Sequence, residues 1–222
     1  MTTNTNDKAV QNELRTLEAI ARFGILMAKD VAAIPFKNAG SDASALNMAN
    51  RTLARLMTLK QVGRKQSRFG YWYYLQESGA RRCNDDLNEQ GIGAFARYGG
   101  HLSVMSTIDR KRCISEVARN LAKNDFEVMG QFALFMVDEE LKEFDMFAVK
   151  KRKNGVYTLG VLVALNVRDS EKFLMQCSTL VKHCNKILIH GETNICQKML
   201  YEANKLDALN GKLMLLRNSG KT

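Results

Sequence analysis

Several features that mark secreted, membrane or zinc-binding proteins are missing from this sequence. Its five cysteines are widely spaced and include no CxxC pair, which argues against a disulfide framework and a zinc ribbon. The three histidines, His101, His183 and His190, fit no standard zinc spacing. The N-terminus lacks the basic and apolar regions of a signal peptide, and no apolar run approaches the roughly 18 residues that a membrane span needs. We therefore expect a cytoplasmic protein with core thiols and no membrane partner.

Common catalytic motifs are missing as well. The sequence contains no Gly-rich phosphate loop, no Ser-His-Asp order and no histidine cluster, and so lacks the motifs of many nucleotide-binding enzymes and hydrolases. What the chain does have is length and a normal apolar content. Its 222 residues are 45% hydrophobic, which is enough for one large domain or two small ones.

Acidic residues are absent from one long internal stretch. Residues 43–70 contain no Asp or Glu, while the whole chain carries a formal charge of +10. A fixed positive surface of this kind favours a polyanionic partner, and double-stranded DNA is the partner we expect. The basic residues of the stretch are Arg51, Arg55, Lys60, Arg64, Lys65 and Arg68.

The pattern around this stretch predicts a winged helix-turn-helix at residues 9–83. Apolar spacing predicts helices over 10–23, 28–34 and 43–59, and Ser41 or Asp42 can cap the third helix. The third helix should bury Leu46, Ala49, Leu53, Leu56 and Leu59. After it, Val62–Lys65 and Tyr71–Leu75 read as the two strands of a basic hairpin.

In such a domain the third helix enters the major groove and the hairpin contacts the DNA backbone. Arg and Asn side chains on a groove helix suit base edges, whereas Lys and Arg on a wing suit phosphates. The predicted DNA-binding residues are therefore Asn47, Asn50, Arg51, Arg55, Lys60, Arg64, Lys65 and Arg68. The alternative is a small helical domain with a solvated basic face.

The second half alternates helices and strands. We expect a linker at 84–106, followed by an α/β domain with a mixed sheet at 107–218. Its predicted elements are a helix at 109–123, an extended run at 126–137, strands at 144–149 and 156–167, a helix at 171–184, a strand at 186–190, a helix at 192–206 and a strand at 212–216. Asn154-Gly155 favours a hairpin turn between the two strands at 144–167.

This element order has the layout of a restriction-endonuclease-like core. Such sites pair an Asp on one hairpin strand with a carboxylate and a Lys spaced by two residues on the partner strand, so that both lie on one face. The carboxylates bind Mg²⁺ and the Lys stabilises charge. Here Asp145 takes the first position as candidate catalytic residue and metal ligand, and Asn166 and Arg168 stand where acid-x-Lys is expected. Glu116, on the preceding helix, and Glu143 are the nearby spare acids. The alternative for Asp145 is a strand-edge acid that faces water or the basic turn at 150–153.

The chain resembles the replication-relaxation family, which includes the MobC-type mobilisation proteins of plasmids. The resemblance rests on the helix from Leu46 to Leu59, the strand Tyr71–Leu75 running into Glu77-Ser78-Gly79, the strand start Phe144-Asp145 and the strand that ends at Asn166. It implies a winged helix joined to a nuclease-like domain, origin binding, and either Mg²⁺-dependent nicking or relaxosome assembly. Asp145 matches the family's hairpin Asp, whereas Ala164 and Asn166 fall where the family usually has acids.

Two functions remain open from the sequence. The first is a DNA-binding protein of plasmid mobilisation that assembles or performs strand nicking, with relaxosome or coupling proteins as partners. The second is a transcriptional regulator whose C-terminal domain either forms a homodimer or senses a ligand. An RNA-binding role comes third, because the sequence has neither an RNP-type aromatic sheet nor a KH loop.

Overall fold

A computed structural model describes residues 5–99, 107–165, 167 and 169–216. The chain divides into two compact units, Met1–Lys111 and Arg112–Thr222, and it has the mixed α/β composition that the sequence predicts. None of the helices within the described ranges has the length and apolar character that crossing a membrane requires.

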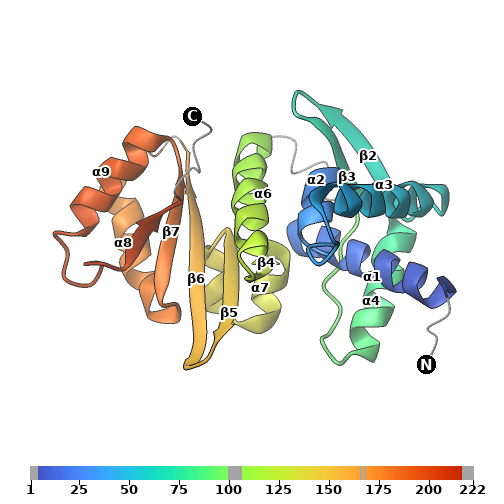
Figure 1. The fold of residues 1–222 in the computed structure, drawn as a ribbon. Coiled ribbons are helices and arrows are strands. Elements are labelled where there is room, and N and C mark those ends of the chain that lie inside the picture. The colour runs from blue at the N-terminus through green and yellow to red at the C-terminus, as the bar shows by residue number, and fades with distance from the viewer. Residues whose placement is uncertain (1–4, 100–106, 166, 168, 217–222) are drawn as a thin grey trace. The chain divides into compact units, whose positions relative to one another are not determined.

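The first unit combines helices with a small antiparallel sheet (Figure 1). The sheet has the strand order β1-β3-β2, so the short first strand lies on the outer edge of the hairpin. The three helices and the hairpin were predicted, but the three-residue strand β1 was not. The elements are α1 (Thr5–Phe23), β1 (Ile25–Met27), α2 (Ala28–Ala33), α3 (Asp42–Thr58), β2 (Val62–Ser67), β3 (Gly70–Leu75) and α4 (Glu77–Glu89).

The apolar stripe of α3 differs from the predicted one. Ala49, Leu53 and Leu56 are buried as expected, but Leu46 and Leu59 are 39% and 47% exposed. The buried positions Ala45 and Thr52 complete the stripe instead. Periodicity fixes the spacing of a stripe, whereas the packing of α3 against α1 and α2 fixes its rotation. The start of the helix follows the prediction, because the Ser41 hydroxyl accepts a hydrogen bond from the Ser44 N–H at 3.1 Å.

The predicted linker begins too early. Helix α4 continues to Glu89, and the segment after it packs back onto the helix. The Asn84 side chain donates to the Ala96 carbonyl at 3.0 Å and accepts from the Ala96 N–H at 2.8 Å. Phe95 and Ala96 are buried. Residues 84–99 therefore belong to the first unit, and residues 100–106 lie outside the described part of the chain.

The second unit is built on a five-stranded mixed sheet of order β4-β5-β6-β7-β8. Strands β4, β5 and β6 are antiparallel neighbours, and β6, β7 and β8 are parallel. Helix α6 lies on one side of the sheet, and α8 and α9 lie on the other (Figure 1). The elements are α6 (Ile108–Lys123), β4 (Glu127–Gly130), α7 (Gln131–Val137), the 3₁₀ helix η2 (Glu139–Glu143), β5 (Met146–Arg152), β6 (Gly155–Ala164), α8 (Ser170–Leu180), the 3₁₀ helix η3 (Val181–His183), β7 (Lys186–Gly191), α9 (Thr193–Ala203) and β8 (Leu213–Leu215).

The predicted extended run at 126–137 is wrong for its second part. The run 126–137 was expected to be extended, but only β4 is a strand, and Gln131–Val137 forms α7. A short apolar run fits a buried helix as well as a strand, so periodicity alone does not separate the two. The β5–β6 hairpin is confirmed. Its two-residue turn is Lys153-Asn154, with Arg152 opposite Gly155.

Candidate functional site

All eight predicted DNA-binding residues of the first unit have exposed side chains. Asn47, Asn50 and Arg51 lie on α3, on the side opposite the buried stripe. Spacings of three and four residues bring these side chains onto one helix face. The polar face of α3 therefore presents amide and guanidinium groups together, as the sequence predicted.

The hairpin supplies three further cations, Arg64, Lys65 and Arg68, and aromatic rings lie against two of them. The Arg64 guanidinium lies 4.7 Å from the centre of the Tyr71 ring, and the Arg68 guanidinium lies 4.8 Å from the centre of the Phe69 ring. Such cation–π contacts limit the conformations of a long side chain while its charge stays accessible. Tyr71 is itself 44% exposed and was not among the predicted site residues.

Two of the eight residues also have carboxylate partners. Arg68 pairs with Asp109, and Arg55 pairs with Glu13 through Nε and Oε1 at 2.6 Å. The Glu13 side chain is only 3% exposed, and its other oxygen lies 2.8 Å from Arg82. Arg55 thus helps to neutralise a buried charge in addition to facing solvent. The sequence around Glu13 contains no pattern that would predict its pairing with Arg55 and Arg82, which lie far along the chain.

Lys60 lies between the helix and the hairpin in an uncommon backbone conformation. Its φ is 54°, the left-handed region in which helices often end. The Lys60 carbonyl accepts a hydrogen bond from the Ser78 hydroxyl at 2.6 Å, which ties this turn to α4. Lys60, at the end of α3, is exposed directly before the basic hairpin.

The candidate site of the second unit lies where β5 begins and β6 ends. Asp145 comes just before β5 and is 5% exposed. Its Oδ2 accepts a hydrogen bond from the Val163 N–H at 2.8 Å. The alternative of an Asp145 that faces water is therefore wrong. The carboxylate instead accepts a hydrogen bond from the backbone of β6, one residue before the strand ends.

Glu116, the predicted spare acid of the catalytic site, lies close enough to His190 to affect its pKa. Burial lowers the pKa of His190, and the nearby Glu116 charge opposes that shift. His190 is the register partner of Val163, so Asp145 and His190 are both adjacent to the same residue of β6. The other two predicted catalytic residues, Asn166 and Arg168, lie outside the described residues.

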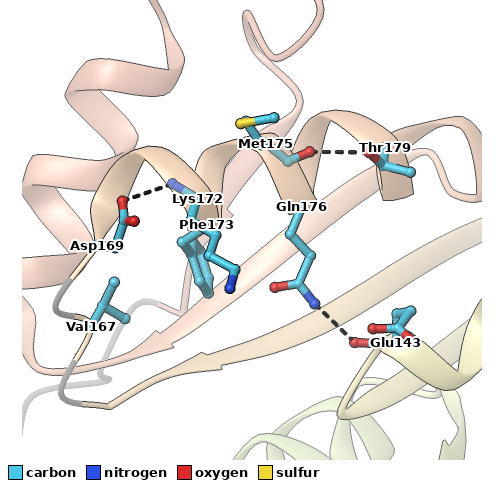
Figure 2. A pocket seen from close by; sticks show the side chains of 8 residues that line it. All are labelled: Glu143, Val167, Asp169, Lys172, Phe173, Met175, Gln176 and Thr179. Carbon is cyan, nitrogen blue, oxygen red and sulfur yellow. Dashed lines mark hydrogen bonds between the residues drawn. The ribbon is translucent and has the colours of Figure 1, made fainter.

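A pocket of about 560 Å³ opens beside this end of the sheet (Figure 2). Glu143, one of the spare acids noted in the sequence, and Asp169, which was not predicted as a site residue, bring carboxylates to its wall. The Asp169 side chain accepts from the Lys172 N–H at 3.0 Å and so caps α8. The Gln176 amide reaches the Glu143 carbonyl at 3.5 Å. Among the residues whose placement is described, no three His, Cys, Asp or Glu side chains are arranged to hold a metal ion.

Three of the five cysteines, Cys83, Cys177 and Cys196, are buried in the core. Burial raises the pKa of Cys83 and Cys177 to about 12 and that of Cys196 to about 11. At neutral pH these three are thiols rather than thiolates, and only a thiolate acts as a nucleophile or metal ligand. All five cysteines are free in the structure.

No family model, no curated protein and no solved structure matches this chain.

Proposed function

We propose that the protein binds duplex DNA sequence-specifically through a winged helix-turn-helix in its first unit. The observation that carries the proposal is the exposure of all eight predicted side chains on α3, the turn after it and the β2–β3 hairpin. No carboxylate interrupts this surface between residues 43 and 70. The element order helix, strand, helix, helix, hairpin, with the first strand paired to the hairpin, also supports it.

The two parts of the surface have different tasks in this proposal. Helix α3 reads base edges in the major groove through Asn47, Asn50 and Arg51, because amide and guanidinium groups can form paired hydrogen bonds with adenine and guanine. The hairpin holds the phosphates through Arg64 and Lys65. Arg55 contributes less than a free arginine, since part of its charge is compensated by Glu13.

Binding assays with single substitutions separate these tasks. Arg51→Ala should lower affinity for the preferred site by roughly 10- to 100-fold and reduce discrimination between sites, as expected for a base contact. Lys65→Ala should weaken binding to all duplexes by a similar factor. Lys198→Ala, an exposed cation of the second unit, is the matched control and should change little. Equal losses from Arg51→Ala and Lys65→Ala on unrelated sequences would refute base reading by α3.

For the second unit we propose a restriction-endonuclease-like core within a plasmid-mobilisation protein, as the family resemblance implies. The strand meander β4-β5-β6 followed by parallel β7 supports this architecture. The burial of Asp145 and its bond to Val163 favour an assembly role over Mg²⁺-dependent nicking, because a metal ligand needs an accessible oxygen.

A nicking assay on supercoiled origin plasmid with Mg²⁺ tests that choice. The proposal expects no nicked circle from the wild-type protein under conditions in which a gel shift shows complete binding. Nicking that disappears in Asp145→Asn would assign catalysis to this site and overturn the assembly role. Binding confined to the protein's own promoter would instead favour the regulator.

A further inference from the structure

A second cleft lies in the second unit and shares no lining residue with the pocket beside Glu143 and Asp169. Its volume is about 810 Å³, large enough for a nucleotide-sized ligand. It is bounded by the end of α6, the start of β4, the β5–β6 hairpin and strands β7 and β8. The side chains that define its character are Asn120, Asn124, Phe126, Lys150, Arg152 and Tyr157.

The floor of this cleft is apolar. Leu159 and Leu188 are buried, and Met214 and Leu216 continue the surface with partial exposure. Ile187 and Ile189 belong to the core cluster shared with α8 and α9, so Leu188 faces the opposite side of the sheet by strand alternation. An apolar floor favours the flat face of a ring over a hydrated ion.

The rim of the cleft is basic and braced by aromatic rings. The Arg152 guanidinium lies 3.9 Å from the centre of the Tyr157 ring, and the Lys150 ammonium lies 5.5 Å from the centre of the Phe126 ring. Lys150 also donates to the Asn124 carbonyl at 2.8 Å. Residues 150 and 152 are two apart on β5 and therefore share a face. Both cations are thus held in place before a ligand arrives.

The charge of the cleft has one sign. None of the described residues that line it carries a carboxylate, and the stretch 146–168 contains no Asp or Glu. A ligand with both an aromatic ring and a negative charge fits an apolar floor beside a fixed basic rim. An acidic peptide would use the rim and leave the floor in water. In a continuous duplex the bases are stacked and paired, so they cannot reach the floor.

We propose that this cleft binds an unpaired nucleotide of a single-stranded nucleic acid. Lys150 and Arg152 hold the phosphate, and the base lies against the apolar floor beside Tyr157. The inference does not depend on duplex binding by the first unit, because it concerns separate residues in the second. A protein that binds duplex through one unit and an unpaired strand through the other could hold a melted site.

The test compares two fluorescent oligonucleotides bound by the full-length protein in anisotropy titrations. One is an eight-nucleotide thymidine strand, and the other is an abasic strand of equal length and charge. The proposal expects the thymidine strand to bind roughly 10-fold more tightly, since stacking of a base on an aromatic surface accounts for that order of affinity. Lys150→Ala/Arg152→Ala should lower binding of both strands at least 10-fold. Tyr157→Ala should remove the preference for bases, whereas Tyr157→Phe should retain it.

The matched control is Lys182→Ala/Lys198→Ala, which removes two cations of the same unit that do not line the cleft. Equal binding by the cleft variant and this control overturns the proposal, and so does equal affinity for thymidine and abasic strands. Competition by polyglutamate as effective as that by thymidine assigns the rim to an acidic peptide and also overturns it. If the wild-type protein binds the single strands but no duplex DNA, the proposed function is contradicted and this inference stands. If it binds duplex DNA but shows none of the expected single-strand binding, only this inference is contradicted.

Discussion

At the scale of single residues, Glu13 links the stability of the first unit to its basic surface. This buried carboxylate on α1 contacts Arg55 of α3 and Arg82 of α4, and Arg82 also donates to Gln61 at 2.8 Å. Its Oε1 has no aligned hydrogen-bond donor among the described residues, so the attraction to Arg55 is electrostatic. The Glu13 carboxylate thus links α1, α3 and α4. It also partly neutralises Arg55, which belongs to the proposed DNA-binding surface.

Replacing Glu13 should therefore affect stability and binding in opposite directions. We expect Glu13→Gln to lower the free energy of unfolding by about 1–3 kcal/mol, below the full cost of breaking a buried pair because Arg55 is half exposed. Affinity for duplex DNA should rise, since Arg55 loses its competing partner. Urea denaturation and gel-shift titrations measure the two effects. The control Glu18→Gln removes the α1 pair with Arg22 and should leave affinity unchanged. A fall in both stability and affinity would contradict this coupling.

His190 gives the second unit a pH-dependent stability. Burial lowers its pKa below the ordinary imidazole value of about 6.5, so below that pH the unfolded chain binds more protons than the folded one. Stability should then decrease as the pH falls below about 6.5. His190→Gln should flatten the profile measured by denaturant unfolding between pH 5 and 8. In Glu116→Gln, a proton NMR titration should find a still lower His190 pKa, because the opposing charge is gone. A His190 pKa above 6.5 in the wild type would exclude this account.

At the scale of elements, close packing constrains strand β6 at one glycine. A Cβ added to Gly160 would overlap the ring of Phe144, and Phe144 is fully buried. Gly160→Ala should destabilise the second unit by about 2–3 kcal/mol, the order expected for overpacking. Gly40→Ala is the control, because no atom lies within 4 Å of its added Cβ. Calorimetry should find a lower Tm only for Gly160→Ala, and Phe144→Leu in the same chain should restore part of it.

Element type could be predicted from the sequence better than element orientation. The third helix, its Ser41 cap and the β5–β6 hairpin all follow from local signals, namely apolar period, capping chemistry and an Asn-Gly pair. The rotation that exposes Leu46 and the helix at Gln131–Val137 depend on tertiary packing. Long-range partners such as Glu13 for Arg55 have no local signature at all. The polar side chains of α3 could be placed off the apolar stripe from the helical period, but the edges of that stripe at Leu46 and Leu59 could not.

At the scale of the whole molecule, the chain has a net charge of +10 and contains two differently built basic surfaces. The α3 and β2–β3 surface is broad and exposed, whereas the rim formed by Lys150 and Arg152 borders an apolar cleft. A broad surface suits a duplex backbone, and a rim above an apolar floor suits one unpaired nucleotide. The net charge indicates the class of partner, but only the placement of the cations distinguishes these two modes.

The salt dependence of binding separates the two surfaces in the intact protein. Each phosphate contact contributes about 0.9 to the slope of log affinity against log salt on duplex DNA. Arg64→Ala/Lys65→Ala should therefore reduce the duplex slope by roughly 2, while Lys150→Ala/Arg152→Ala should leave it nearly unchanged. On a short single strand the cleft pair, which holds one phosphate, should reduce the slope by about 0.7. Gel-shift titrations from 50 to 300 mM salt measure both slopes. Equal reductions by both pairs on duplex would mean that one continuous backbone-binding surface involves both units, and the assignment of separate partners would be wrong.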